Sequence, residues 1–189
     1  MDQIADTALI ELAVHNNDQL AFGELVKRHQ STIRHSLRQL SNWNESLADD
    51  LAQETFIQAY TALGQFNGKA KFSSWLYRIA YNQFLQHCRK NQAQKNFAEF
   101  EEVDDNEFQA PLEPAEDKPA ASQLQGQLAA LLAQLEPERR SVLHLLLYKQ
   151  YTQQEIATTM GIPLGTVKTH INRGRAELQK RLVHWQEKL

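Results

Sequence analysis

The sequence predicts an all-α protein with two small helical domains joined by a flexible acidic linker. Apolar residues recur at helical spacing in both halves of the 189-residue chain. Between the halves, residues 91–125 carry nine acidic and two basic residues together with three prolines, and have too little periodicity to bury a core. Near the C-terminus, a short capped helix, a glycine and a second helix have the layout of a helix-turn-helix. The predicted boundaries are 1–92, 93–122 and 123–189.

The N-terminal domain is expected to contain four helices. Residues 3–40 predict two of them, broken at 15–17, with Asp18 as the N-cap of the second. A third helix is expected at 47–63 and is ended by Gly64. The fourth follows a basic loop, with Ser73 as its expected N-cap.

The third predicted helix carries apolar residues on two sides. Its main apolar face comprises Ala52, Phe56, Ala59, Tyr60 and Leu63. Leu51 and Ile57 fall on the other side, and the polar residues around them are Asp50, Gln53, Glu54 and Gln58. Apolar groups ringed by carboxylates and amides suit a protein-binding surface. The pattern alone equally allows Leu51 and Ile57 to pack on a neighbouring helix.

The loop and helix that follow combine aromatic rings with cations. The residues concerned are Phe66, Asn67, Gly68, Lys69, Lys71, Phe72, Trp75, Tyr77 and Arg78. Rings of this kind can stack on unpaired bases while Lys and Arg contact phosphates. The alternative is that the helix aromatics, including Tyr81 and Phe84, pack in the domain core. Core packing is the preferred interpretation for any single ring of the helix, and surface exposure for the loop.

The C-terminal segment predicts a DNA-reading helix. Thr152 and Glu155 form a capping box, Gly161 ends the first helix, and a second is expected to start near Thr166. One side of the second helix carries Val167, Ile171, Gly174 and Leu178; the opposite side carries Thr169, Asn172 and Arg173, flanked by Lys168 and Arg175. An apolar back and a short polar front suit entry into the major groove. An ordinary basic surface helix is the alternative.

Composition excludes several classes of protein. A formal net charge of −3 hides a basic C-terminal part, because residues 126–189 carry nine basic and five acidic side chains. Cys88 is the only cysteine, so no disulfide can form within the chain. The seven histidines form no metal-ligand spacing and no Gly-rich phosphate loop occurs, so we expect no metal, no cofactor and no catalysis. The absence of an apolar span or secretion signal predicts a cytoplasmic protein without membrane insertion.

Three segments resemble the extracytoplasmic-function (ECF) sigma factors of bacteria. They are DDLAQETFIQAY at 49–60, FNGKAKFSSWLYRIAYN at 66–82 and GTVKTHINRGRAEL at 165–178. The resemblance covers both predicted domains in the family's order. It implies an all-helical protein without enzymatic activity that binds core RNA polymerase and directs promoter recognition and DNA melting. It also implies an inhibitory anti-sigma factor as a partner.

The resemblance implies roles for individual residues. The polymerase-docking set is Asp50, Leu51, Gln53 and Glu54, to which the mixed helix face adds Ile57. The loop 66–72 and the helix after it, including Asn82, would hold a flipped base of the upstream-ten element and help to melt the duplex. The recognition helix would read the upstream thirty-five element with Lys168, Thr169 and Arg173, and the predicted contact set there also includes Thr166, Asn172 and Arg175.

The chain departs from the family pattern at three positions. Gln86 stands where Asp is usual, His170 where Arg is common, and Gly174 where Ala is common. A self-sufficient helix-turn-helix repressor or activator is the second functional hypothesis. Such a protein needs a dimer interface or a ligand pocket, and a long acidic linker suits neither.

Overall fold

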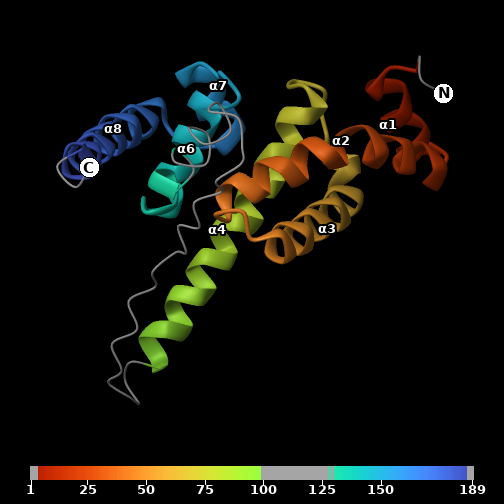
Figure 1. Ribbon diagram of the computed structural model, residues 1–189. Coiled ribbons are helices and arrows are strands. Elements are labelled where there is room, and N and C mark those ends of the chain that lie inside the picture. Colours follow the sequence, from red (N-terminus) through yellow and green to blue (C-terminus); the bar gives the residue numbers. More distant parts are fainter. Residues whose placement is uncertain (1–3, 99–127, 129, 187–189) are drawn as a thin grey trace, which may run out of the picture. The chain divides into compact units, whose positions relative to one another are not determined.

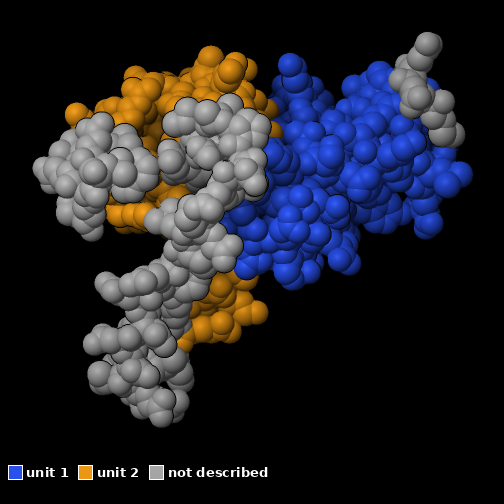
Figure 2. Space-filling view, in the orientation of Figure 1, with its two compact units in different colours: residues 1–84, 158–161 blue, residues 85–157, 162–189 orange. Residues whose placement is uncertain are grey.

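The computed structural model describes residues 4–98, 128 and 130–186, and these are helical apart from turns and short loops (Figure 1). The helices are α1 (Asp6–His15), α2 (Gln19–Leu40), α3 (Glu45–Ala62), α4 (Phe72–Ala98), α6 (Pro137–Leu147), α7 (Gln153–Met160) and α8 (Leu164–Gln186), with a 3-10 turn η1 (Leu63–Gln65) after α3. No strand occurs in these residues, which agrees with the predicted all-α class. Two compact units are distinguished in Figure 2: residues 1–84 with 158–161, and residues 85–157 with 162–189.

The first unit is built on α2, which packs against both α1 and α3. The predicted cap is confirmed, because Asp18 accepts hydrogen bonds from the backbone N–H groups of Leu20 and Ala21 at 2.9 and 3.2 Å. The helix then buries Leu25 and Leu37 completely. Fully burying a leucine side chain contributes about 1.5–3 kcal/mol, so this stripe fixes the face of α2 that turns inward.

Several helix boundaries differ from those predicted. α3 begins at Glu45, because the Asn44 side chain caps it by accepting from Leu47 N–H at 3.0 Å. The expectation that Ser73 is an N-cap is wrong: α4 already includes Phe72, and Trp75 N–H donates to the Lys71 carbonyl at 3.1 Å. α4 also continues through Ala98, past residue 92. Most of the predicted linker lies outside the described residues.

In the second unit α6 packs against α8. Pro137 opens α6 at its first turn, where a missing N–H costs nothing. The side of α8 predicted to be apolar is buried: Val167 is 0 %, Ile171 2 % and Leu178 9 % exposed. Leu178 joins a cluster with Leu132, Leu135 and Leu143. Burial of this side leaves the opposite side of α8 facing outward.

Gly174 sets how closely α6 and α8 approach. A methyl group placed on its Cα would lie 2.7 Å from Cδ1 of Leu143, a side chain that is only 1 % exposed. The departure from the family's alanine therefore has a steric reason in this chain. Leu143 occupies the volume that an alanine methyl would need.

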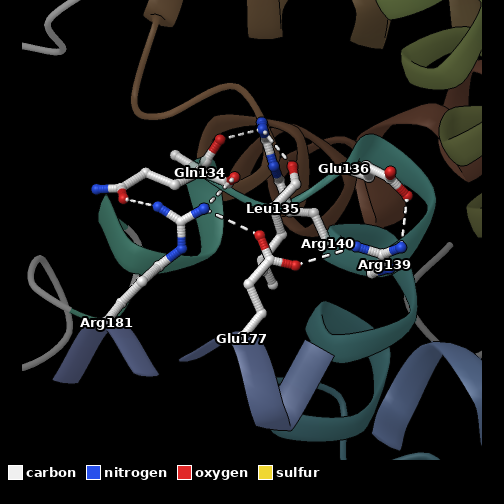
Figure 3. Close-up of polar contacts among 8 residues, drawn as sticks. Gln134, Leu135, Glu136, Arg139, Arg140, Glu177 and Arg181 are labelled. Carbon is white, nitrogen blue, oxygen red and sulfur yellow. Dashed lines mark hydrogen bonds and ion pairs between the residues drawn. The ribbon is translucent and has the colours of Figure 1, made fainter. Parts of the chain in front are cut away.

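A network of arginines ties the two helices together (Figure 3). Glu177 of α8 accepts from Arg139 of α6 at 3.0 Å and from Arg181 at 2.9 Å. Arg181 also bonds Gln134, and Arg140 donates to the Ala133 and Leu135 carbonyls that end the preceding helical turn. These guanidinium groups tie α8 to α6 and to the turn that precedes α6.

We predict that Gly174→Ala destabilises the protein by about 1 kcal/mol, because overpacking costs about 1–3 kcal/mol and the gain in helix propensity recovers roughly 1 kcal/mol. The measurement is chemical denaturation. On a Leu143→Val background, where the clashing methyl is gone, the same change should be neutral or stabilising. Equal destabilisation in both backgrounds would contradict the steric explanation.

Glu177→Gln should lower the free energy of unfolding at pH 7 by roughly 1 kcal/mol, since it removes two partly exposed ion pairs. The hydrogen bond from Arg181 lowers the pKa of Glu177 below its ordinary 4.5. A carboxyl with a lowered folded-state pKa stabilises above its unfolded-state pKa and loses that contribution as the pH falls. The difference between the two proteins should therefore shrink below about pH 4.5. Glu136→Gln, which removes a single exposed pair, is the control and should have the smaller effect.

Candidate functional site

The outward side of α8 carries the residues predicted to bind DNA. Lys168, Thr169, Asn172, Arg173 and Arg175 are all exposed. Thr166 is half-buried. The Thr169 hydroxyl donates to the Gly165 carbonyl at 2.9 Å, so its hydrogen is used within the helix and its oxygen can still accept a hydrogen bond. The predicted separation of an apolar back from a polar front is confirmed for the residues whose side chains are described.

The N-terminus of α7 and the turn between α7 and α8 have the predicted cap and glycine. Glu155 N–H donates to the Thr152 hydroxyl at 3.2 Å, and Thr152 N–H donates to the Glu155 carboxylate at 2.8 Å, which completes the capping box. Gly161 has φ +67°, a left-handed conformation that favours glycine at a helix end. The Pro163 carbonyl accepts from Thr166 and Val167, so α8 starts at Leu164 rather than near Thr166.

Not every cation of this unit is available to a ligand. Arg139 and Arg181 pair with Glu177, as described above, and their roles were not found from the sequence. A clue was present: Glu177 and Arg181 are four residues apart on a helix. The distant partner Arg139 gives no local signal.

His170 adds no positive charge to α8. Burial lowers its pKa, and the nearby Arg139 guanidinium lowers it further. The ordinary histidine value is about 6.5, so His170 is neutral at physiological pH. The common family arginine would have been charged there, which leaves the charge of this surface to Lys168, Arg173, Arg175 and Lys180.

The loop predicted to hold a flipped base carries a small aromatic cluster. Ring centroids of Phe66 and Trp75 lie 5.5 Å apart, and those of Phe72 and Trp75 lie 5.6 Å apart in a stacked arrangement. Phe72 is 5 % exposed, whereas Phe66 and Trp75 are half-buried. The rings that a ligand can reach are therefore those of Phe66 and Trp75. The prediction that Phe72 contacts DNA is corrected, because its ring is buried.

Polar and basic groups surround this cluster. Asn67, Gly68, Lys69, Lys71, Arg78 and Asn82 are exposed. Gly68 has φ +69°, and Lys69 N–H donates to the Asn67 side chain at 3.1 Å, so the loop is held by a local turn.

Tyr77 does not belong to this surface. It is 5 % exposed, with Tyr81 and Phe84 at 1 % each. Burial raises the pKa of its hydroxyl, which is hydrogen-bonded to Ser36. The prediction that Tyr77 contacts DNA is corrected: its ring is part of the core, as the alternative interpretation held.

A groove lies between α2 and α3. Its volume is about 560 Å³, and its apolar lining comes from Phe22, Val26, Ala52, Phe56, Ile57 and Tyr60. The α3 side of the rim carries Asp49, Asp50 and Gln53. Asp49 pairs with Arg34 at 2.9 Å, whereas Asp50 and Glu54 are exposed and make no ion pair within the described part of the chain. Free carboxylates beside an apolar groove can receive a partner that is apolar and basic.

Of the two apolar residues on the mixed face of α3, Ile57 fits a binding surface and Leu51 fits packing within the domain. Ile57 is 52 % exposed, as a binding surface requires, and Gln53 is exposed beside it. Leu51 is 7 % exposed and belongs to the core. The expectation that Leu51 lies on the outer surface is therefore wrong, because a neighbouring element covers it.

The described residues hold no cluster of three or more metal-ligating side chains. Within the same residues, no helix combines the length and apolar character needed to cross a bilayer.

Comparison with known proteins identifies the family. Residues 25–94 match the Sigma-70 region 2 family and residues 125–178 the Sigma-70, region 4 family. The chain is 34% identical to the ECF RNA polymerase sigma factor SigW of Bacillus subtilis over 175 residues, covering 89% of the chain and 92% of SigW. It is 32% identical to the RNA polymerase sigma-H factor of Pseudomonas aeruginosa over 188 residues, covering 96% of each.

Two solved structures have the same fold as this chain over most of its length. CnrH, in complex with the cytosolic domain of CnrY, is similar with a TM-score of 0.63 and 27% identity, covering 96% of this chain and 99% of CnrH. RpoE from Bartonella quintana, solved with the anti-sigma factor NepR, shares the fold with a TM-score of 0.64 and 22% identity, covering 85% of this chain and 96% of RpoE. Both halves of the chain are thus matched, in the expected order, and the chain belongs to the ECF RNA polymerase sigma factors.

Proposed function

We propose that this sigma factor docks on core RNA polymerase through the α2–α3 groove. It reads promoter DNA with the loop 66–71, with the part of α4 up to Asn82, and with α8. The observation that carries the proposal is the two-sided α8, whose apolar side is buried and whose polar and basic side is free. The matched regions 2 and 4 supply the context for the assignment. The chain directs transcription without catalysis of its own and acts in the cytoplasm, where the polymerase works.

The upstream thirty-five element is assigned to α8. Thr169 and Asn172 present short polar groups suited to base edges. The Arg173 guanidinium can donate two hydrogen bonds to O6 and N7 of a guanine. Lys168 and Arg175, on one flank of this face, supply phosphate contacts that position the helix without reading sequence. Thr166, half-buried in the first turn, sits where a recognition helix begins its contact with the groove.

The upstream-ten element is assigned to the aromatic cluster and the exposed groups around it. An extruded base loses its stacking, which costs a few kcal/mol. The rings of Phe66 and Trp75 can restore stacking. Lys69, Lys71 and Arg78 would contact the backbone of the melted strand. The buried ring of Phe72 stacks on Trp75 and holds that ring in position.

Core RNA polymerase is assigned to the α2–α3 groove. Ile57 and the apolar lining would supply the buried centre of that interface, and Asp50, Gln53 and Glu54 its polar rim. Leu51 is buried and takes part in the core beneath this surface, not in the interface itself.

The remaining assignments concern organisation and regulation. We retain 1–92 as the region 2 domain, 93–122 as the linker and 123–189 as the region 4 domain, with α4 reaching into the linker. An anti-sigma factor is proposed as a regulator. This is supported by CnrH, which was solved with the cytosolic domain of a second protein.

Transcription in vitro tests the docking assignment. Purified chain, core polymerase and a promoter library should give promoter-dependent transcripts, and promoter binding should require the core enzyme. Asp50→Ala with Glu54→Ala should reduce core-enzyme affinity about tenfold, since rim charges contribute to association. Glu11→Ala with Glu45→Ala, an equal charge change at exposed residues away from the groove, is the control. Unchanged affinity in the first variant would remove the docking assignment, and firm promoter binding without polymerase would favour an independent repressor or activator.

Arg173→Ala should weaken selection at one or two base pairs of the upstream thirty-five element by ~1–3 kcal/mol, because a bidentate base contact is lost. The measurement is transcription from a library randomised in that element. Lys180→Ala, on the same exposed side of α8, should lower DNA affinity without changing base preference. Base preferences that survive the Arg173 substitution would contradict the assignment.

A further inference from the structure

A small polar network joins the start of α1 to α2. The Asp6 carboxylate, in the first turn of α1, accepts from the Arg28 guanidinium at 3.2 Å and pairs with Nε2 of His29 at 2.8 Å. An ionised carboxylate can only accept hydrogen bonds, so His29 carries a hydrogen on Nε2. Arg28 also donates to the Ile4 carbonyl at 2.6 Å. The Asp6 carboxylate, itself held by Arg28, therefore fixes the orientation of the His29 ring.

The His29 ring also packs against the aromatic cluster described above. It meets the Phe72 ring edge-to-face, with centroids 5.3 Å apart and an interplanar angle of 72°. Phe72 stacks on Trp75 at 5.6 Å and meets Phe66 edge-to-face at 5.7 Å. Aromatic pairs favour edge-to-face and offset-stacked arrangements, so the place of each ring restricts that of the next. A continuous set of contacts thus leads from Asp6, by way of His29 and Phe72, to the two rings that a base can reach.

Burial makes this set of contacts stiff at its inner end. The His29 side chain is 18 % exposed and Phe72 is 5 % exposed. Phe66 and Trp75, at the outer end, are half-buried. A ring in a close-packed interior shifts only when its neighbours shift with it. Because His29 is one of those neighbours, it constrains the ring on which Trp75 stacks.

We propose that Asp6 and His29 are positioning residues for capture of the flipped base of the upstream-ten element. They hold Phe72 from the side of α1 and α2, and Phe72 in turn holds the two outer rings at the spacing that receives the base. The inference rests on the proposed role of the aromatic cluster. Capture must offset the cost of unstacking the base, so it depends on rings that are in place before the base arrives. Through Asp6, α1 takes part in promoter melting without supplying a base contact.

The test measures how much the captured base contributes to binding. The full-length chain and core polymerase are bound to a promoter fragment recovered from the library, with its upstream-ten region left unpaired. The same fragment is then made with an abasic site at each position of that element in turn. At the captured position, the abasic site should weaken binding by the wild type about tenfold, because stacking on the rings is lost. The ratio of the two affinities isolates the base, and the fraction of folded protein cancels from it.

His29→Ala and Asp6→Ala should each lower this ratio about threefold, because the rings are then less well positioned. Asp6→Asn should keep the ratio near that of the wild type, since its amide oxygen can still accept from His29. Glu24→Ala is the matched control. It removes the other ion pair of Arg28, at 3.1 Å, and leaves Asp6 and His29 unchanged, so the ratio should not fall.

An unchanged ratio in His29→Ala and Asp6→Ala overturns the proposal while the base-holding role of the cluster stands. An equal fall in Glu24→Ala also overturns it, because the effect would then belong to the α1–α2 contact in general. A different result tests the cluster itself. If no abasic site weakens binding by the wild type, and Trp75→Ala binds the unpaired fragment as tightly, the cluster holds no base. The proposed upstream-ten function then fails together with this inference.

Discussion

The packing of α6 on one side of α8 is the constraint on which the DNA-reading half depends. Leu143 lies against the bare Cα of Gly174, and Glu177 is held between Arg139 and Arg181. These contacts cover the apolar residues and immobilise the helix. The opposite side, with Thr169, Asn172 and Arg173, stays exposed. A helix covered on one side and free on the other is what entry into a major groove requires.

Charge is used in two distinct ways in this unit. Arg139 and Arg140 are half-buried and spend their hydrogen bonds on Glu177 and on backbone carbonyls, so they act as structural clamps. Lys168, Arg173 and Arg175 are exposed and remain available to phosphates and bases. His170 lies beside Arg139 and is neutral because burial and that guanidinium disfavour its charged form. The basic excess of the C-terminal part is therefore divided between side chains that hold the fold and side chains that stay exposed.

In the first unit too, buried and exposed side chains of similar chemistry lie close together on one helix. Phe72 and Tyr77 are buried, and their neighbours Trp75 and Arg78 reach the surface from the same helix. On α3, Leu51 is buried and Ile57 is exposed, although both fall outside its main apolar face. Asp49 is tied to Arg34 while the adjacent Asp50 carries no ion pair among the described residues. Residues of similar chemistry on one helix thus differ in whether the fold engages their side chains or leaves them exposed.

The sequence by itself determined the all-α class, the helix-turn-helix with its capping box and glycine, the Asp18 cap and the two-sided character of α8. All of these depend on local hydrogen bonding and on the 3.6-residue period, which are properties of short segments. Only the tertiary structure decided that Leu51 and Tyr77 are internal, that Gly174 is needed against Leu143, and that Arg139 and Arg181 serve Glu177. A periodic pattern shows which residues share a side of a helix, but the neighbouring helices determine which side is covered, and those neighbours come from distant parts of the chain.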